Sequence, residues 1–160
     1  MKKLFSLGWG KPKQESAAGE ESEPMDAESV ALIEGYAERI LATLRKGEPT
    51  ATYDSNSVRR LGADLTANGA RYTPDQRVKI ANMYGAFLGR AILVTYPQFQ
   101  GKWVRWRGDV GIEFAHRDAG RRKILFPITK AFKHIENGEP DSIHALFSAV
   151  PEFVQSNPAA

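Results

Sequence analysis

The sequence predicts an α+β protein with three N-terminal helices, a three-stranded antiparallel β-meander and two short C-terminal helices. Two observations predict this class. Apolar residues recur every three or four positions between residues 27 and 95, which is the spacing of amphipathic helices. After Gly101 the period changes to two, and turn residues separate three short apolar runs, as in a β-meander.

Length and composition indicate one folded domain. The chain has 160 residues, with 42% hydrophobic and 26% charged side chains, close to the averages of soluble globular proteins. It contains no cysteine, which excludes disulfide frameworks, thiolate zinc sites and cysteine nucleophiles. The apolar patch after Lys2 and Lys3 is too short and too broken by glycine for a signal peptide, so we expect a cytoplasmic protein. No apolar run reaches the roughly eighteen residues of a membrane-spanning helix.

The N-terminal residues differ in composition from the rest of the chain. Residues 1–26 contain a small, polar and acidic stretch, QESAAGEESEPMD, that lacks the apolar side chains needed to offset the entropy of ordering. We therefore expect a disordered tail over 1–26, one α+β domain over 27–155 and a flexible C-terminus over 156–160. The apolar residues near the start of the tail leave open a contact with a membrane surface or a partner: Leu4, Phe5, Leu7 and Trp9.

Three helices are predicted in the first half of the domain. The first spans about 27–46 with Asp26 as its N-cap, and a weaker one spans about 55–68. The third begins at the capping box formed by Thr73 and Gln76 and continues to about residue 95. It is apolar nearly all round and carries a stripe of small residues at four-residue spacing, which indicates close approach of the sheet or the second helix: Ala81, Gly85 and Gly89.

The predicted strands raise a question of register. A loop of three residues, or a bulged loop, sets Trp106 opposite Ile112 and Val104 opposite Phe114, which gives the sheet one wholly apolar face. This register predicts that Trp106 is in the core. It also places Trp103 on an open basic face, although helices on both sides of the sheet would bury Trp103 as well.

Two short helices close the chain. The first is predicted over 128–136, and the second begins at the N-cap candidate Asp141 and is stopped by Pro151. The predicted core contains the following residues: Ile40, Leu61, Phe87, Leu88, Ile92, Trp106, Ile112, Phe114, Phe132 and Phe147.

Four segments together resemble a broad group of small bacterial domains of unknown function. They are MYGAFLGRAI (83–92), KWVRW (102–106), ILFPITKAFKHIENGEPDSI (124–143) and ALFSAVPEF (145–153), within a resemblance over residues 52–153. Some similar domains occur among immunity-type and other interaction proteins. The resemblance implies an α+β fold and a bacterial origin, but no activity, because its motifs consist of packing and turn residues. Arg90 stands where that group often has an acidic residue.

The sequence offers no residues that we assign to catalysis, a cofactor or a metal. The histidines are His116, His134 and His144. His116 ends the second strand and could act as an acid or base, but it is interpreted as a polar residue beside a turn. His134 and Glu136 lack the four-residue spacing that places two metal ligands on one helix face. No Gly-rich loop lies between a strand and a helix, as a phosphate site requires. Carboxylates such as Glu113 and Asp118 lie near turns and are interpreted as solvated charges.

The basic and aromatic strand is the predicted binding surface. Residues 102–133 carry nine Lys and Arg residues against three acidic ones. We assign binding to four of the residues in and around the strands: Trp103, Arg105, Arg107 and Arg122. The preferred function is a non-enzymatic protein-binding module with an unknown protein partner. Nucleic-acid binding through the same face is the first alternative, and an enzyme of unknown type is the second.

Overall fold

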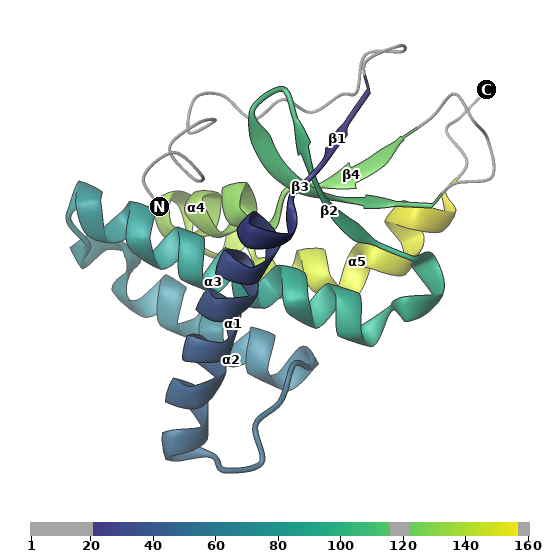
Figure 1. The fold of residues 1–160 in the computed structure, drawn as a ribbon. Helices are drawn as coiled ribbons and strands as arrows, with labels where there is room; N and C mark the ends of the chain where they lie inside the picture. Colours follow the sequence, from purple (N-terminus) through teal and green to yellow (C-terminus); the bar gives the residue numbers. More distant parts are fainter. Residues whose placement is uncertain (1–20, 116–121, 157–160) are drawn as a thin grey trace.

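The computed structural model describes residues 21–115 and 122–156, and it confirms the α+β class. The described residues form five α-helices and one antiparallel sheet of four strands in the order β1-β2-β3-β4 (Figure 1). The elements are β1 (Glu23–Pro24), α1 (Ala27–Gly47), α2 (Ser55–Asn68), α3 (Pro74–Thr95), β2 (Lys102–Trp106), β3 (Asp109–Phe114), β4 (Lys123–Leu125), α4 (Pro127–Asn137) and α5 (Ile143–Gln155). Single 3₁₀ turns occur at Gly69–Arg71, Pro97–Phe99 and Glu139–Asp141.

The additional strand, β1, lies in the segment that the sequence assigned to the tail. Pro24 pairs with Val104 and Glu23 with Arg105 at the free edge of β2. Asp26 then caps α1 by accepting a hydrogen bond from the Ser29 amide at 2.7 Å, as predicted. The rest of the predicted tail, residues 1–20, and the predicted C-terminus from residue 157 lie outside the described residues.

Helix α3 is the centre of the helical layer, and its predicted start is confirmed. Thr73 and Gln76 form both hydrogen bonds of a capping box, and Pro74 occupies the first turn. Along its length α3 packs against α1 and α4. In Figure 1 the five helices lie on one side of the sheet, with α3 running beneath it.

The small residues of α3 allow two different elements to approach. A Cβ atom at Gly85 would overlap the backbone of Ile128 in α4, and one at Gly89 would overlap the indole ring of Trp103 in β2. The sequence predicted that another backbone, of the sheet or of the second helix, approaches these glycines. At Gly89 the sheet comes close through the Trp103 side chain and not through its backbone. The helix that meets Gly85 is α4 and not the second helix.

The predicted register of the β2–β3 hairpin is wrong. The prediction set Trp106 opposite Ile112 and Val104 opposite Phe114, whereas Trp106 lies opposite Asp109 in the structure. The prediction assumed that one face of the sheet is apolar and the other open. Both faces are in fact buried, so an apolar residue belongs on either side and alternation alone does not select the register.

The hairpin loop has two residues and not three. Arg107 and Gly108 both have positive φ, 50° and 82°, which is the backbone of a type I′ turn. This conformation costs an ordinary L-residue about 1 to 2 kcal/mol, and glycine accepts it freely. The guanidinium of Arg107 lies over the ring of Trp106, with its carbon 4.5 Å from the ring centroid, and this contact offsets part of the cost.

The last helix begins and ends later than predicted. Its N-cap is Ser142, which accepts from the Ala145 amide at 3.2 Å, and Pro151 lies inside α5. A proline removes the amide that would bond to the carbonyl four residues earlier, here that of Phe147. The hydroxyl of Tyr96 donates to this carbonyl at 3.1 Å. A side chain from another element thus supplies the missing donor, and the helix continues to residue 155.

The predicted core is confirmed with one exception. All of its members are buried except Phe132, which is only partly buried and packs against the main core.

Arg90, the position at which the sequence differs from the small bacterial domains it resembles, has defined partners in the structure. Arg90 pairs with Glu34 of α1, with 3.2 Å between Nε and Oε2, and its guanidinium lies over the ring of Tyr53.

Candidate interaction surface

The two faces of the sheet follow from the observed register. The near face contacts α3 and consists of Trp103, Arg105, Val110, Ile112, Phe114, Lys123 and Leu125. The far face points the other way and consists of Lys102, Val104, Trp106, Asp109, Gly111, Glu113 and Ile124. These two names are used below in this sense.

The expectation that Trp103 lies on an open basic face is wrong. Its side chain is 5% exposed and packs on the near face in the space that the absence of a side chain at Gly89 leaves free. Arg105 shares this face at the edge where β1 begins and is half-buried. Their pairing with Ile112 and Val110 of β3 turns both side chains toward the helical layer.

The other two predicted residues lie elsewhere. Arg107 is exposed at the hairpin turn, above the ring of Trp106. Arg122 directly precedes β4 and belongs to the far side, where it pairs with Glu113 at 3.2 Å. The four predicted residues therefore do not form one surface, although Arg107 and Arg122 flank the same face. A role for each of them in binding stays a prediction.

The far face carries a second apolar cluster, separate from the main core. Val104 is 0% exposed and Trp106 is 1% exposed, yet neither joins the group of buried residues that surrounds α3. The ring of Phe126 lies 6.1 Å from that of Trp106. A side chain at Gly111 would collide with Ile124 and Phe126, so glycine lets these side chains lie across β3. We call Val104, Trp106, Ile124 and Phe126 the Trp106 cluster.

Sequence reasoning identified Trp106 as a core residue and missed its place on a second surface. The indole nitrogens of both Trp103 and Trp106 are buried without a hydrogen-bond partner. A buried, unpaired N–H typically costs about 1 to 3 kcal/mol. Trp103 contacts Gly89 of α3, whereas Trp106 belongs to the opposite face of the sheet. A two-residue loop at Arg107 and Gly108 fixes the register of β2 and β3, and with it the side chains that share a face with Trp106.

A polar contact at the edge of the far face joins three distant parts of the chain. Ser22 donates to one carboxylate oxygen of Glu113 at 2.9 Å. Arg122 donates to Ser22 at 2.9 Å and to the other oxygen of Glu113 at 3.2 Å. The side chain of Glu113 is only 13% exposed. Its negative charge is compensated by hydrogen bonds from Ser22 and Arg122. The contact ties the residue before β1 to β3 and β4.

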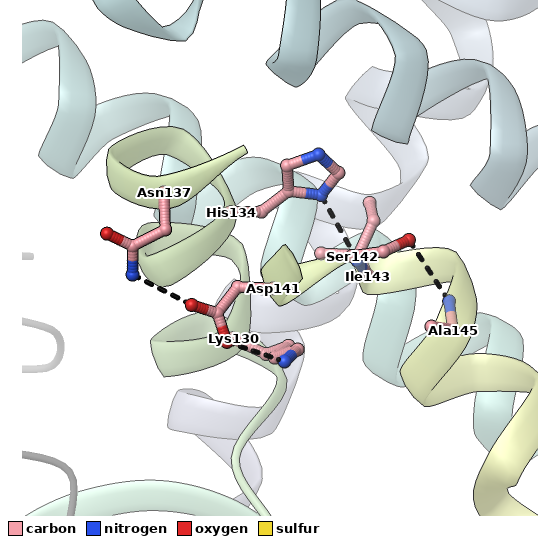
Figure 2. A network of polar contacts seen from close by, with 7 residues as sticks. All are labelled: Lys130, His134, Asn137, Asp141, Ser142, Ile143 and Ala145. Carbon is pink, nitrogen blue, oxygen red and sulfur yellow. Dashed lines mark hydrogen bonds and ion pairs between the residues drawn. The ribbon is translucent and has the colours of Figure 1, made fainter. Parts of the chain in front are cut away.

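Among the described residues, the most buried titratable group belongs to a different site, at the junction of α4 and α5. His134 is 0% exposed, and its Nδ1 accepts a hydrogen bond from the Ile143 amide at 3.1 Å (Figure 2). Its Nε2 lies 2.8 Å from the hydroxyl of Thr66, which donates to Glu139. Because Nδ1 accepts, Nε2 carries the proton and donates to Thr66. Both ring nitrogens therefore hold elements together.

Neighbouring residues complete this junction and fix the start of α5. Asp141 accepts from Lys130 at 3.0 Å and from Asn137 at 2.7 Å (Figure 2). These two hydrogen bonds lower the pKa of Asp141 below its usual value. Burial lowers the pKa of His134, because the cation would lose its hydration. The neutral imidazole is thus the form that the fold selects.

The other histidines do not extend this network into a reactive site. Nε2 of His144 lies 2.9 Å from the hydroxyl of Ser55, and His116 lies outside the described residues. Across residues 21–115 and 122–156, no group of three or more His, Asp or Glu side chains is arranged to hold a metal ion. No helix in the same ranges is both long and apolar enough to cross a membrane.

Comparison of the chain with protein-family models, with curated protein sequences and with solved structures finds no match. The resemblance to small bacterial domains therefore stays a prediction. The geometry favours the far face of the sheet as the candidate site, because Trp103 is buried against Gly89 while the Trp106 cluster lies outside the main core.

Proposed function

We propose that this protein is a non-enzymatic protein-binding module that contacts its partner through the far face of the sheet. The observation that carries the proposal is the Trp106 cluster, in which a tryptophan with an unpaired indole N–H lies beneath an arginine. Tryptophan and arginine are enriched among the residues that dominate binding energy at protein interfaces. An interaction or immunity-type role, as the resemblance to small bacterial domains implies, and a location in the cytoplasm belong to the same proposal.

The chemistry of the far face indicates what a partner must supply. The partly buried side chains of Ile124 and Phe126, which border the buried ring of Trp106, fit an aliphatic or aromatic side chain of a partner. The N–H of Trp106 is enclosed in the cluster and would donate to a carbonyl or carboxylate oxygen of the partner once the cluster opens. Arg107 and Lys102, both exposed at the rim, favour an acidic group beside that side chain. An extended polypeptide segment meets all three needs.

Nucleic-acid binding has less support than it had from the sequence. Trp103, the residue expected to stack on bases, is buried against Gly89. The ring of Trp106 is 1% exposed and already contacts Phe126. Arg122 pairs with Glu113, which reduces the charge it offers to phosphates. A flat aromatic platform with free cations is the usual design of single-strand binders, and the far face lacks the platform.

Photo-cross-linking in cells tests the proposal. A benzophenone amino acid is placed at Lys102 or at Arg107, with Ala42 on the exposed side of α1 as the matched control position. We expect both rim positions to yield the same heavier adduct, containing a second polypeptide, which excess unlabelled protein competes away. The control position should not yield it.

Two results would contradict the proposal. Adducts that are equally abundant from Ala42 would show that the far face has no preference for a partner. Micromolar binding of a fluorescent single-stranded oligonucleotide that weakens steeply with salt, and is lost in Arg105→Ala/Arg107→Ala, would instead favour the nucleic-acid alternative.

A further inference from the structure

We propose that Asn137 is a site of spontaneous deamidation whose product loosens the start of α5, and that the fold directs this reaction away from Asn68. The chain contains two Asn-Gly dipeptides, Asn68–Gly69 at the end of α2 and Asn137–Gly138 at the end of α4. The two dipeptides are chemically identical, so only their surroundings distinguish them. The inference concerns a covalent modification and is independent of the proposed function.

The reaction needs only the chain itself and water. Glycine has no side chain to shield its amide nitrogen, which makes an asparagine before glycine especially reactive. The Gly138 nitrogen loses its proton to water or hydroxide and forms a bond to Cγ of Asn137. The bond from Cγ to the side-chain nitrogen breaks, and this nitrogen takes up a proton and leaves as ammonia. Water then opens the succinimide ring at either carbonyl, so residue 137 becomes aspartate or isoaspartate.

The Asn137–Gly138 dipeptide lies at the surface, where α4 ends. Gly138 has φ 74° and ψ −149°, so the chain leaves the helix there, and its amide makes the terminal hydrogen bond to the His134 carbonyl at 2.8 Å. Asn137 is exposed and donates to Asp141 at 2.7 Å (Figure 2). A Cβ atom at Gly138 would meet no atom within 4 Å, so the amide has room around it. One terminal hydrogen bond and one exposed contact therefore hold the two reacting groups apart.

The Asn68–Gly69 dipeptide is enclosed by two other helices. Gly69 is buried, and a Cβ atom there would lie 2.7 Å from the carbonyl oxygen of Ile135 in α4. Asn68 is half-buried and donates to Asp64 at 2.6 Å. Asp64 in turn accepts a hydrogen bond from the hydroxyl of Tyr84 in α3. Freeing this dipeptide for reaction therefore requires α2 to move away from α3 and α4.

The free energy of local opening decides which dipeptide reacts. Proteins open locally at a cost that ranges from near zero at fraying ends to the global free energy of unfolding for packed elements. The end of α4 belongs to the first kind, and the packed end of α2 belongs to the second. The opened form that can react is therefore populated far more at Asn137 than at Asn68.

The product places a second carboxylate beside Asp141. The side-chain amide that now donates to Asp141 becomes a negatively charged oxygen, so an attractive contact becomes a repulsive one. Asp141 ends the 3₁₀ turn directly before Ser142, the N-cap of α5. The next residue, Ile143, donates its amide to the buried ring of His134 (Figure 2). Deamidation of Asn137 thus weakens the turn that positions the first residues of α5.

Mass spectrometry of the incubated native protein tests the site. Trypsin cleaves after Arg60, Arg71 and Lys133, so the two dipeptides fall on different peptides, 61–71 and 134–160. At mildly alkaline pH, we expect conversion to aspartate and isoaspartate to be more than about tenfold faster at Asn137 than at Asn68, because only the end of α4 opens easily. In concentrated denaturant, the two rates should become similar.

The unfolded chain is the control for intrinsic reactivity. Similar rates at both sites in the native protein, or a faster rate at Asn68, would overturn the inference. So would an Asn137 that stays intact in the native protein for as long as the denatured chain needs to react at both sites.

Variants test the consequence for α5. Asn137→Asp should lower the melting temperature and raise the pKa of Asp141, because the hydrogen bond from Asn137 is the main cause that lowers this pKa. Asn137→Ser removes that hydrogen bond without adding charge, and its effect on both quantities should be smaller. Asn137→Asp/Asp141→Asn again pairs a donor with an acceptor and should recover part of the lost melting temperature.

Two results would overturn the consequence for α5. One is a melting temperature of Asn137→Asp equal to that of the wild type. The other is a double variant that melts no higher than Asn137→Asp, which would show that repulsion between residues 137 and 141 is not the cause.

Discussion

The near and far faces of the sheet carry one buried tryptophan each, but they are closed by different means. Trp103 on the near face fits a space left by Gly89 in α3, a helix with its own capping box. Trp106 on the far face is equally buried, yet it is separate from the main core, and its face of the sheet is turned away from α3. The difference teaches that low exposure alone does not identify a residue as part of the folding core. What covers the residue decides its role.

The largest expected effect concerns the near face. Trp103→Ala should lower the free energy of unfolding by about 3 to 5 kcal/mol, because it leaves a large cavity beneath α3. Denaturant melts of the wild type and the variant measure it. An unchanged midpoint would show that Trp103 does not support the helical layer.

The corresponding change on the far face tests the Trp106 cluster. Trp106→Ala should also cost about 3 to 5 kcal/mol, because it removes a ring that is 1% exposed and lies beside Phe126. Denaturant melts measure the loss. A loss as small as that of an exposed side chain would contradict the packing of this second cluster.

Gly89 tests how tightly the near face is packed. Gly89→Ala forces a Cβ atom into the ring of Trp103 and should cost about 1 to 3 kcal/mol through overpacking. Gly35→Ala is the matched control, because Gly35 is exposed in α1 and its added Cβ meets no atom within 4 Å. That variant should gain about 0.5 to 1 kcal/mol from helix propensity. Similar effects at both positions, measured by thermal melts, would show that α3 and β2 have room to separate.

Acid should weaken the helical layer. The pKa of His134 is lowered by burial, so its contribution is complete above the unfolded value near 6.5 and is lost as the pH falls through the lower folded value. The contribution of His134 to the free energy of unfolding should change by no more than about 1.4 kcal/mol per pH unit, because one group takes up one proton. Melts between pH 8 and about pH 5 should show this decline in the wild type and less of it in His134→Asn. An equal decline in both would assign the effect to other groups.

The smallest expected effect lies at the hairpin turn. Arg107→Asn relieves the cost of positive φ but removes the contact with the Trp106 ring, so stability should change by less than about 1 kcal/mol. Binding of a partner should weaken, which cross-linking from Lys102 would show as a fainter adduct. An unchanged adduct would mean that Arg107 serves the turn and not the interface.

The sequence contains enough local information for the helices and too little for the sheet. The capping box at Thr73 and Gln76 and the N-cap at Asp26 are short-range features, and both are confirmed. A strand of two residues such as β1 has no period to detect. The end of α5 was missed because the donor that replaces the Pro151 amide is Tyr96, a residue far away in the sequence.

The candidate site was predictable only in part. Arg107 and Arg122 do flank one face of the sheet, as a basic run suggests. Which tryptophan accompanies them depends on the hairpin register, and a register moved by one residue exchanges the two faces. Arg107 in a left-handed conformation selects the observed register, although arginine carries no sequence signal for such a turn.

The short strand β1 has a consequence for self-association. The Met25 amide points inward to the carbonyl oxygen of Trp103, so the amide of the preceding residue would point outward from the sheet. That residue is Pro24, which has no amide hydrogen. The outer edge of β1 therefore lacks the donor with which a strand of another molecule would begin to pair. On this side the sheet is protected against edge-to-edge growth and aggregation by a single proline.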